Sequence, residues 1–367
     1  MKRLSASNAG VPGHQGLSSL RMPAEWEPHA ATWLAWPHYK DDWPGKFEPI
    51  PWVYAEIVRH LARHERVELI VNDAAAEKRA RRVLDLANAL GNNVSFHRWP
   101  TNRVWTRDSG CTFVAGSADA RAGDLCAVKW RFNGWAKYPN YKHDEKIGSL
   151  MAKAADAPEV HAICGKNRVV LEGGSIDVNG QGTLLTTEEC LLSKIQQRNP
   201  AMKREDYEKV FAEYLGISNV IWLGAGITGD DTHGHVDDIT RFVAPDTVVT
   251  AVESDPEDAN YEPLRENIRR LRAATDQDGK QLAIVELPMP APVVFEGRRL
   301  PASYGNFYIA NGLVLVPVFN DPNDRIALDV LADLFPDREV VGIYSGDLIW
   351  GFGAMHCMTQ QQPQIGS

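Results

Sequence analysis

The chain has 367 residues, of which 44% are hydrophobic and 24% charged, the balance of a soluble globular protein rather than a disordered one. Its formal net charge of −9 argues against a nucleic-acid partner, because phosphates are bound by basic surfaces. No apolar run approaches the roughly 20 residues that span a bilayer, so no membrane partner is expected.

The N-terminal segment and the cysteines indicate in which cellular compartment the protein is found. Residues 1–20 include basic side chains with no apolar segment behind them, which indicates a disordered lead-in rather than a secretory signal. The cysteines are odd in number, widely spaced and without a CxxC pair, which disfavours a zinc site of that type. Such thiols indicate a reducing compartment, so we expect a cytoplasmic protein. The cysteines are Cys111, Cys126, Cys164, Cys190 and Cys357.

Helical and strand-like patterns alternate along the chain. Apolar periodicity predicts helices over 52–66, 75–90, 204–215, 257–273 and 324–335. Strands are predicted over 67–72, 94–99, 111–115, 125–131, 168–171, 175–178, 182–187, 219–223, 239–243, 246–252, 281–286, 304–310, 312–318 and 339–344. Asn179-Gly180 predicts a hairpin. No long linker divides the chain, so we expect one α/β domain with its site where the strand–helix modules converge.

Cys357 is the first candidate for chemistry. Its neighbours Gly351, Gly353 and His356, and the polar residues 359–362, favour an irregular exposed loop over a core position. A thiol with an ordinary pKa of about 8.5 must be deprotonated before it can attack a substrate. The other four cysteines lie in apolar, strand-like stretches and are expected to be buried.

His235 lies in a run of Asp and His residues, 229–238, that is expected to open a strand. Strand alternation would place His235 and Asp237 on one face, where the carboxylate could support a general acid and base. Two alternatives remain open. The run could be a solvated acidic turn, or it could hold a metal. The metal ligands would then be Asp231, His233, His235 and Asp237.

Two further acids follow predicted strands. Asp108 stands in Trp-Thr-Arg-Asp, where it could equally form a surface pair with Arg107 or cap a helix. Glu172 precedes Gly173-Gly174, a place where backbone can approach closely, although a Glu there is more often a turn residue.

Together these motifs resemble the agmatine deiminases, of the family that includes the bacterial peptidyl-arginine deiminases, within the guanidino-group-modifying superfamily. The resemblance covers nearly the whole chain. It implies a pseudo-fivefold α/β propeller (the pentein fold) as a single catalytic domain over 21–364, and a homodimer. The matching segments are 22–29, 32–37, 105–108, 133–135, 171–175, 186–192, 234–237, 306–312 and 356–361.

The resemblance also implies roles. Cys357 would attack the central carbon of a guanidinium whose nitrogens are gripped by Asp108 and Asp237. His235, oriented by Glu172, would protonate the departing ammonia and then activate water. No metal and no organic cofactor is required, and the partner is a small cationic guanidino compound.

The chain departs from the family pattern at two places. Asp177 stands where the family often has His, and residues 351–355 read Gly-Phe-Gly-Ala-Met where it often reads Gly-Gly-Gly-Asn and one further residue. We expect Asp177 to bind substrate by adding negative charge near the pocket, which favours the amine of agmatine. Hydrolysis of agmatine to N-carbamoylputrescine and ammonia is therefore the first hypothesis.

Two other functions remain open at this point. Arginine or peptidyl-arginine would be the substrate if an arginine side chain entered the pocket to meet a carboxylate. The candidates for that are Arg107, Arg131, Arg241 and Arg298. A non-catalytic guanidino-binding protein is the third hypothesis, although a pure binder has no use for Cys357.

Overall fold

The computed structural model describes residues 20–116 and 125–365. The expected lead-in, residues 1–20, lies outside these ranges apart from Leu20, which begins the short strand β1 (Leu20–Arg21). The fold is α/β, as predicted, and its sheets combine antiparallel and parallel strand pairs. No helix within the described ranges has the length and apolar character needed to cross a bilayer.

Five sheets in the described ranges repeat one pattern, an antiparallel strand pair followed by a parallel pair. Their orders are β21-β2-β3-β4, β1-β5-β6-β7, β10-β11-β12, β13-β14-β15 and β18-β19-β20. The strands are β2 (His29–Ala35), β3 (Arg66–Val71), β4 (Val94–Arg98), β5 (Thr112–Gly116), β6 (Leu125–Lys129), β7 (Glu159–His161), β10 (Asp177–Val178), β11 (Thr183–Thr187), β12 (Asn219–Leu223), β13 (Thr240–Ala244), β14 (Thr247–Val252), β15 (Ala283–Pro288), β18 (Tyr308–Ala310), β19 (Leu313–Val318), β20 (Glu339–Tyr344) and β21 (Thr359–Pro363).

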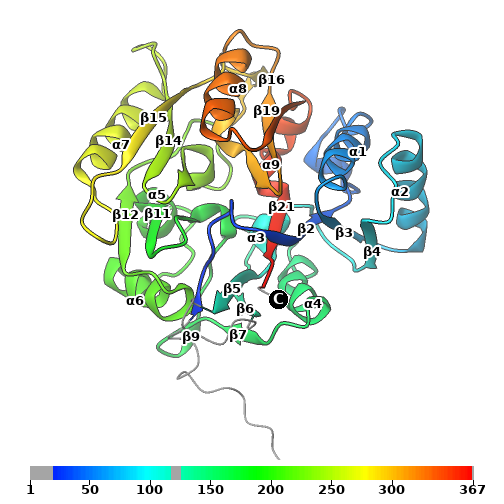
Figure 1. Ribbon diagram of the computed structural model, residues 1–367, viewed down its shortest axis with the longest axis horizontal. Helices are drawn as coiled ribbons and strands as arrows, with labels where there is room; N and C mark the ends of the chain where they lie inside the picture. Colours follow the sequence, from blue (N-terminus) through cyan, green and yellow to red (C-terminus); the bar gives the residue numbers. More distant parts are fainter. Residues whose placement is uncertain (1–19, 117–124, 366–367) are drawn as a thin grey trace, which may run out of the picture.

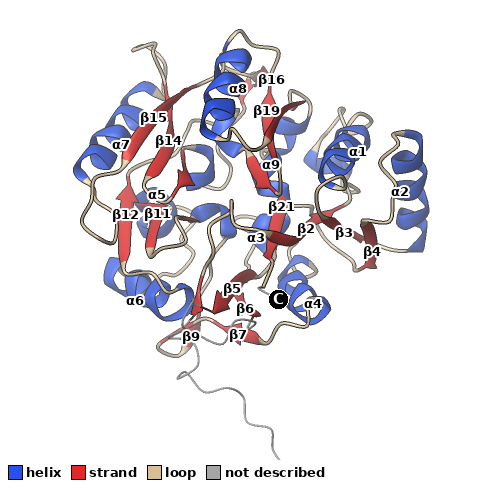
Figure 2. Ribbon diagram, viewed as in Figure 1, coloured by secondary structure: helices blue, strands red, loops and turns tan. Residues whose placement is uncertain are grey.

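A helix connects the two parallel strands of each pattern, as a parallel pair requires. These connecting helices are α1 (Ile50–Leu61), α4 (Ile147–Ala154), α6 (Arg204–Leu215), α7 (Tyr261–Ala273) and α8 (Asn323–Leu334), with α2 (Ala74–Leu86) added between β3 and β4. Figure 1 shows them around the outside of the molecule, and Figure 2 shows the strands nearer its centre. Their amphipathic periodicity reflects this position, with one face on a sheet and the other in solvent.

A short helix precedes the first strand of each pattern. These are α3 (Thr106–Ser109), η4 (Gly173–Ser175), η5 (Val236–Asp238), η6 (Tyr304–Asn306) and α9 (Met355–Met358). Each contacts the next along the chain, and α9 contacts α3, so the series closes on itself. Five segments that are far apart in sequence thus meet in one cluster.

Most predicted elements occur within a few residues of their expected bounds. The hairpin at Asn179-Gly180 is confirmed, because β10 and β11 pair antiparallel across it and Gly180 has a φ of +71°. The predicted strand 168–171 is wrong, since β9 (Asn167–Arg168) ends early. The predicted strand 304–310 begins as the 3-10 helix η6. The helix α4 and the strands β2, β7 and β21 were not predicted.

Candidate active site

Cys357 lies within the short helix α9 and is 5% exposed, so the expected exposed loop is wrong. Asn306 fixes this helix: its Oδ1 accepts from the backbone N–H groups of His356 (3.0 Å) and Cys357 (3.3 Å). Its Nδ2 donates to the Cys357 Sγ at 3.1 Å. Burial, together with Asp237, Asp238 and Asp108, raises the pKa of Cys357 well above its usual value. The unliganded site therefore holds a neutral thiol.

His235 is fully buried between two carboxylates. Its Nε2 lies 3.6 Å from Glu172 Oε2 and its Nδ1 lies 3.9 Å from Asp108 Oδ1. Burial alone would lower the pKa of His235, but Asp108, Cys190 and Glu172 raise it well above its ordinary value. Within the described residues, neither ring nitrogen has a hydrogen-bond partner. Buried polar atoms are rarely left unpaired, so these nitrogens mark a place for a ligand or water.

Gly174 is the point at which three site residues meet. A Cβ there would lie 2.5 Å from His235 Nδ1, 2.9 Å from Asp237 Oδ2 and 3.1 Å from Asp108 Oδ1. The expectation of close backbone approach at Gly173-Gly174 is confirmed. The expectation that His235 and Asp237 share one face of a strand is wrong, because they stand at the 3-10 helix η5. They converge through the glycine and not through strand alternation.

Glu172 is held by a residue that we did not predict. Arg198 Nε donates to both carboxylate oxygens of Glu172 at 3.2 Å, and its other nitrogens donate to backbone oxygens of Gln196 and Thr232. Burial would raise the pKa of Glu172, but Arg198 and His235 hold it below its usual value. Glu172 is thus an ionised carboxylate facing His235. No sequence motif marks Arg198, which lies in a loop 26 residues away.

Asp108 is fixed through both oxygens. Its Oδ1 accepts from the Gly174 backbone N–H at 3.0 Å, and its Oδ2 accepts from Trp135 Nε1 at 2.8 Å. Burial, with Asp237 and Glu172, raises the pKa of Asp108 to about 6. Asp108 therefore neither caps a helix nor pairs with Arg107, whose guanidinium binds Glu25.

Asp237 is oriented by His356, which in turn contacts Glu25. Its Oδ2 lies 2.7 Å from His356 Nδ1, while His356 Nε2 lies 2.8 Å from Glu25 Oε2. Burial would raise the pKa of Asp237, but His356 holds it below its usual value. Asp237 Oδ2 is also 3.7 Å from the Cys357 Sγ, and Asp237 Oδ1 has no partner within the described chain. One oxygen of this ionised carboxylate, Oδ1, is thus left for a cationic ligand.

Asp177 does not lie where we expected. Its Oδ2 pairs with Arg241 Nε at 2.5 Å and its Oδ1 accepts from the Phe242 backbone N–H at 2.8 Å. It is buried, and groups of the protein itself occupy both of its carboxylate oxygens. The predicted role in the substrate pocket is therefore wrong, and Asp177 instead neutralises a buried arginine. Of the arginines considered, Arg298 lines the pocket, whereas Arg131 is exposed outside it.

The proposed metal ligands do not converge within the described ranges. Asp231 binds Lys137 and Tyr138, His233 faces Ser193 and Glu189, and His235 and Asp237 have the partners given above. Two other buried groups each bring three potential ligands within 4.8 Å: Glu172, Cys190 and His235, and Asp237, Asp238 and Cys357. Each already contains a carboxylate that is bound by another side chain of the protein: Glu172 by Arg198, and Asp237 by His356.

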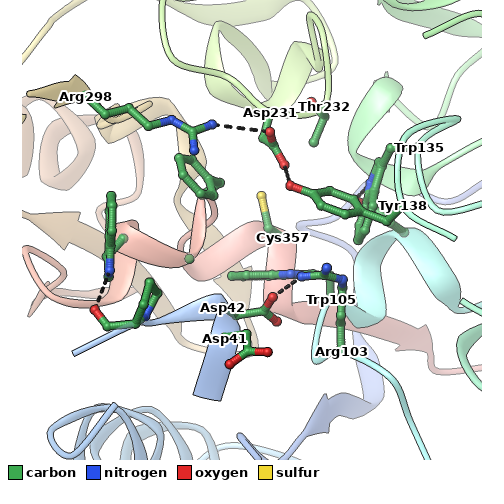
Figure 3. A pocket seen from close by; sticks show the side chains of 15 residues that line it. Asp41, Asp42, Arg103, Trp105, Trp135, Tyr138, Asp231, Thr232, Arg298 and Cys357 are labelled. Atoms are coloured by element: carbon green, nitrogen blue, oxygen red, sulfur yellow. Dashed lines mark hydrogen bonds and ion pairs between the residues drawn. The ribbon is translucent and has the colours of Figure 1, made fainter. Parts of the chain in front are cut away.

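A pocket with a volume of about 230 Å³ leads to Cys357 (Figure 3). Pockets for drug-sized ligands begin at roughly 300 Å³, so this one suits a smaller molecule. The buried Asp108 lines it together with Asp41, Asp231 and Arg298. Its aromatic walls are Trp105, Trp135, Tyr138, Trp350 and Phe352. A short chain ending in a planar cation would fit between such walls.

Comparison with known proteins agrees with this geometry. Residues 21–363 match the family of Porphyromonas-type peptidyl-arginine deiminases. An agmatine deiminase of Pseudomonas syringae is 37% identical over 367 aligned positions, which cover 94% of this chain and 95% of that one. The structure of the Enterococcus faecalis agmatine deiminase is similar at a TM-score of 0.87, with 30% identity over 98% of this chain and 100% of that one.

A second solved structure is an agmatine deiminase of C. jejuni with a cysteine replaced by serine and substrate bound. It is similar at a TM-score of 0.82, with 29% identity over 94% of this chain and 97% of that one. Because the family model matches nearly all of the described sequence, the chain belongs to the Porphyromonas-type peptidyl-arginine deiminase family.

Proposed function

We propose that this protein hydrolyses agmatine to N-carbamoylputrescine and ammonia through a covalent intermediate on Cys357. One observation carries the proposal. The Cys357 thiol and the Asp108 carboxylate line one small pocket, and Asp108 meets Asp237 and His235 at Gly174; the His235 ring nitrogens have no partner within the described residues. Carboxylates fit the N–H groups of a planar guanidinium, and the thiol is the nucleophile that its central carbon requires.

Substrate binding activates the nucleophile in this scheme. The carboxylates raise the pKa of the Cys357 thiol, and a guanidinium placed between them offsets their charge. The thiol then loses its proton to solvent, and the thiolate attacks the central carbon. A bound cation is thus needed to form the nucleophile, which protects the free enzyme from wasteful thiol chemistry.

His235 transfers the protons of both steps. The anionic surroundings keep its imidazole protonated at first, so it gives a proton to the departing ammonia as the carbon–nitrogen bond breaks. The neutral imidazole then takes a proton from water, whose oxygen attacks the amidino carbon. The carbon–sulfur bond breaks, N-carbamoylputrescine leaves, and the Cys357 thiolate is restored. Glu172 keeps the ring in place through both steps.

The outer part of the pocket decides between substrates. Asp41 offers negative charge to the distal ammonium of agmatine, and Asp231 offers it in competition with Lys137 and Arg298. Arginine or peptidyl-arginine is the second candidate, since Arg103 and Arg298 line the same pocket and could meet a carboxylate. Arg103 already pairs with Asp42, which favours agmatine.

Ammonia release tests the proposal. Agmatine, arginine and an internal peptidyl-arginine are assayed with the wild type and with Cys357→Ala, with and without prior EDTA dialysis. We expect turnover of agmatine that is abolished in the variant and unaffected by EDTA. Turnover of arginine or the peptide would keep the chemistry and change the substrate. Activity that survives Cys357→Ala and is lost with EDTA would replace the mechanism by a metal-dependent one.

We further propose that the five repeated sheets form a pseudo-fivefold α/β propeller, as one domain over 21–364, with the site on its axis. The closed series of contacts among α3, η4, η5, η6 and α9 supports this arrangement. We propose a cytoplasmic location, which the free cysteines support, and a homodimer that needs no metal or cofactor. Sedimentation and metal analysis of the purified protein test the last two points.

A further inference from the structure

Asp231, the acid at the outer part of the pocket, is already surrounded by donors. Lys137 Nζ binds its Oδ1, Tyr138 OH donates to its Oδ2 at 2.5 Å, and an Arg298 nitrogen lies 3.5 Å from Oδ1. Figure 3 shows Arg298 and Tyr138 reaching this carboxylate from opposite sides. A substrate ammonium that approaches Asp231 must therefore compete with cations of the protein itself.

Arg298 is held in this position by an aromatic ring. Its Cζ lies 3.9 Å from the ring centroid of Phe352, a cation–π contact, and the Phe352 ring packs 6.0 Å from that of Trp350. Phe352 has a φ of +68°, a left-handed conformation that favours glycine. It stands where the family pattern described above often has a glycine. A strained aromatic residue beside a binding pocket points to a role in function.

We propose that Arg298, supported by Phe352, is a specificity-determining residue that weakens the binding of cationic substrate tails and strengthens the binding of anionic ones. This inference rests on the proposed guanidino chemistry but does not depend on agmatine being turned over. Lys137 and Tyr138 remain on Asp231 in any case. Arg298 has a side chain that is 50% exposed, so it can move aside or turn toward a carboxylate.

Two ligands of similar shape and opposite tail charge can show whether Arg298 acts through its charge. Agmatine and 4-guanidinobutyrate share the guanidinium and three methylenes, and the second has a carboxylate in place of the aminomethyl group. Removing the charge in Arg298→Gln should tighten agmatine and weaken 4-guanidinobutyrate. Partly exposed ion pairs change an affinity by up to about fivefold, so the ratio of the two affinities, which change in opposite directions, should change by up to about 25-fold. The change should shrink as salt is added.

The measurement is calorimetric binding of both ligands to Cys357→Ala, with and without Arg298→Gln, at low and high salt. Arg269→Gln is the control, since Arg269 is an exposed arginine on α7 that pairs with Glu266. Phe352→Gly is the second variant, because it removes the ring beneath Arg298 while suiting the backbone at that position. We expect the affinity ratio to shift in the same direction for both pocket variants and to stay constant in the control.

An unchanged ratio in Arg298→Gln, or an equal shift in Arg269→Gln, would overturn the inference. A shift in Phe352→Gly alone would also overturn it, since the ring and not the charge would then set the preference. Failure of the proposed function would give a different experimental result. The wild type would release no ammonia from agmatine, while the binding ratio would still report on Arg298.

Discussion

Replacing Gly174 by alanine should abolish most activity while the protein remains folded. The added Cβ would lie 2.5 Å from His235 Nδ1, where ordinary contact begins at 3.4 Å, so the ring must retreat by roughly 0.9 Å. Misplacement of a reacting group by about 1 Å can lower a rate by about 10²-fold, or about 2.7 kcal/mol of barrier. The carboxylates of Asp237 and Asp108, at 2.9 and 3.1 Å from the same Cβ, would be displaced as well.

The assay is steady-state ammonia release from agmatine, together with thermal unfolding. Overpacking at one buried site costs about 1–3 kcal/mol of stability, so Gly174→Ala should remain folded at assay temperature. Gly91→Ala is the matched control, because a Cβ at Gly91 meets nothing within 4 Å and its φ is not in the left-handed region. A kcat for Gly174→Ala within about threefold of that of the control would refute the convergence of His235, Asp108 and Asp237 on this glycine.

Three further outcomes follow from the site. Glu172→Gln should leave Arg198 buried without its anion and destabilise the fold by about 3–5 kcal/mol in urea unfolding, and a change below about 1 kcal/mol would contradict the pairing. Asp177→Asn should lower the melting temperature through Arg241 but leave the KM for agmatine unchanged, whereas a raised KM would restore its role in the pocket. Because Asp108 has a pKa raised to about 6 and must be ionised to bind a guanidinium, kcat/KM should fall as pH drops through about 6. A profile that is flat down to pH 5 would contradict this reading.

The sequence predicted all of the connecting helices except α4. The connecting helices α6, α7 and α8 occur near their expected bounds, because each has an apolar face on a sheet and a polar face in solvent. Strand β21 was missed because its Thr-Gln-Gln-Gln run reads as a loop. In the fold the run is buried, and Gln361 and Gln362 accept hydrogen bonds from Arg107 and Trp33.

The sequence predicted the residues of the candidate site but not the residues that hold them in position. Glu172 and His235 stand in recognisable motifs, whereas Arg198 and Glu25 act through partners that no local pattern indicates. The contact between Glu25 and His356 joins residues 331 positions apart. The exposure of Cys357 was predicted wrongly for a related reason. The polar residues that follow Cys357 form hydrogen bonds inside the protein, so their polarity does not indicate exposure to solvent.

Trapping the covalent intermediate tests the central claim most directly. Wild-type enzyme is mixed with agmatine, quenched in acid within the first turnovers and digested, and the peptides are analysed by mass spectrometry. The account predicts a mass increase equal to agmatine minus ammonia on the peptide that carries Cys357, and none in Cys357→Ser. Full turnover without such an adduct, or an adduct on another of the five cysteines, would contradict it.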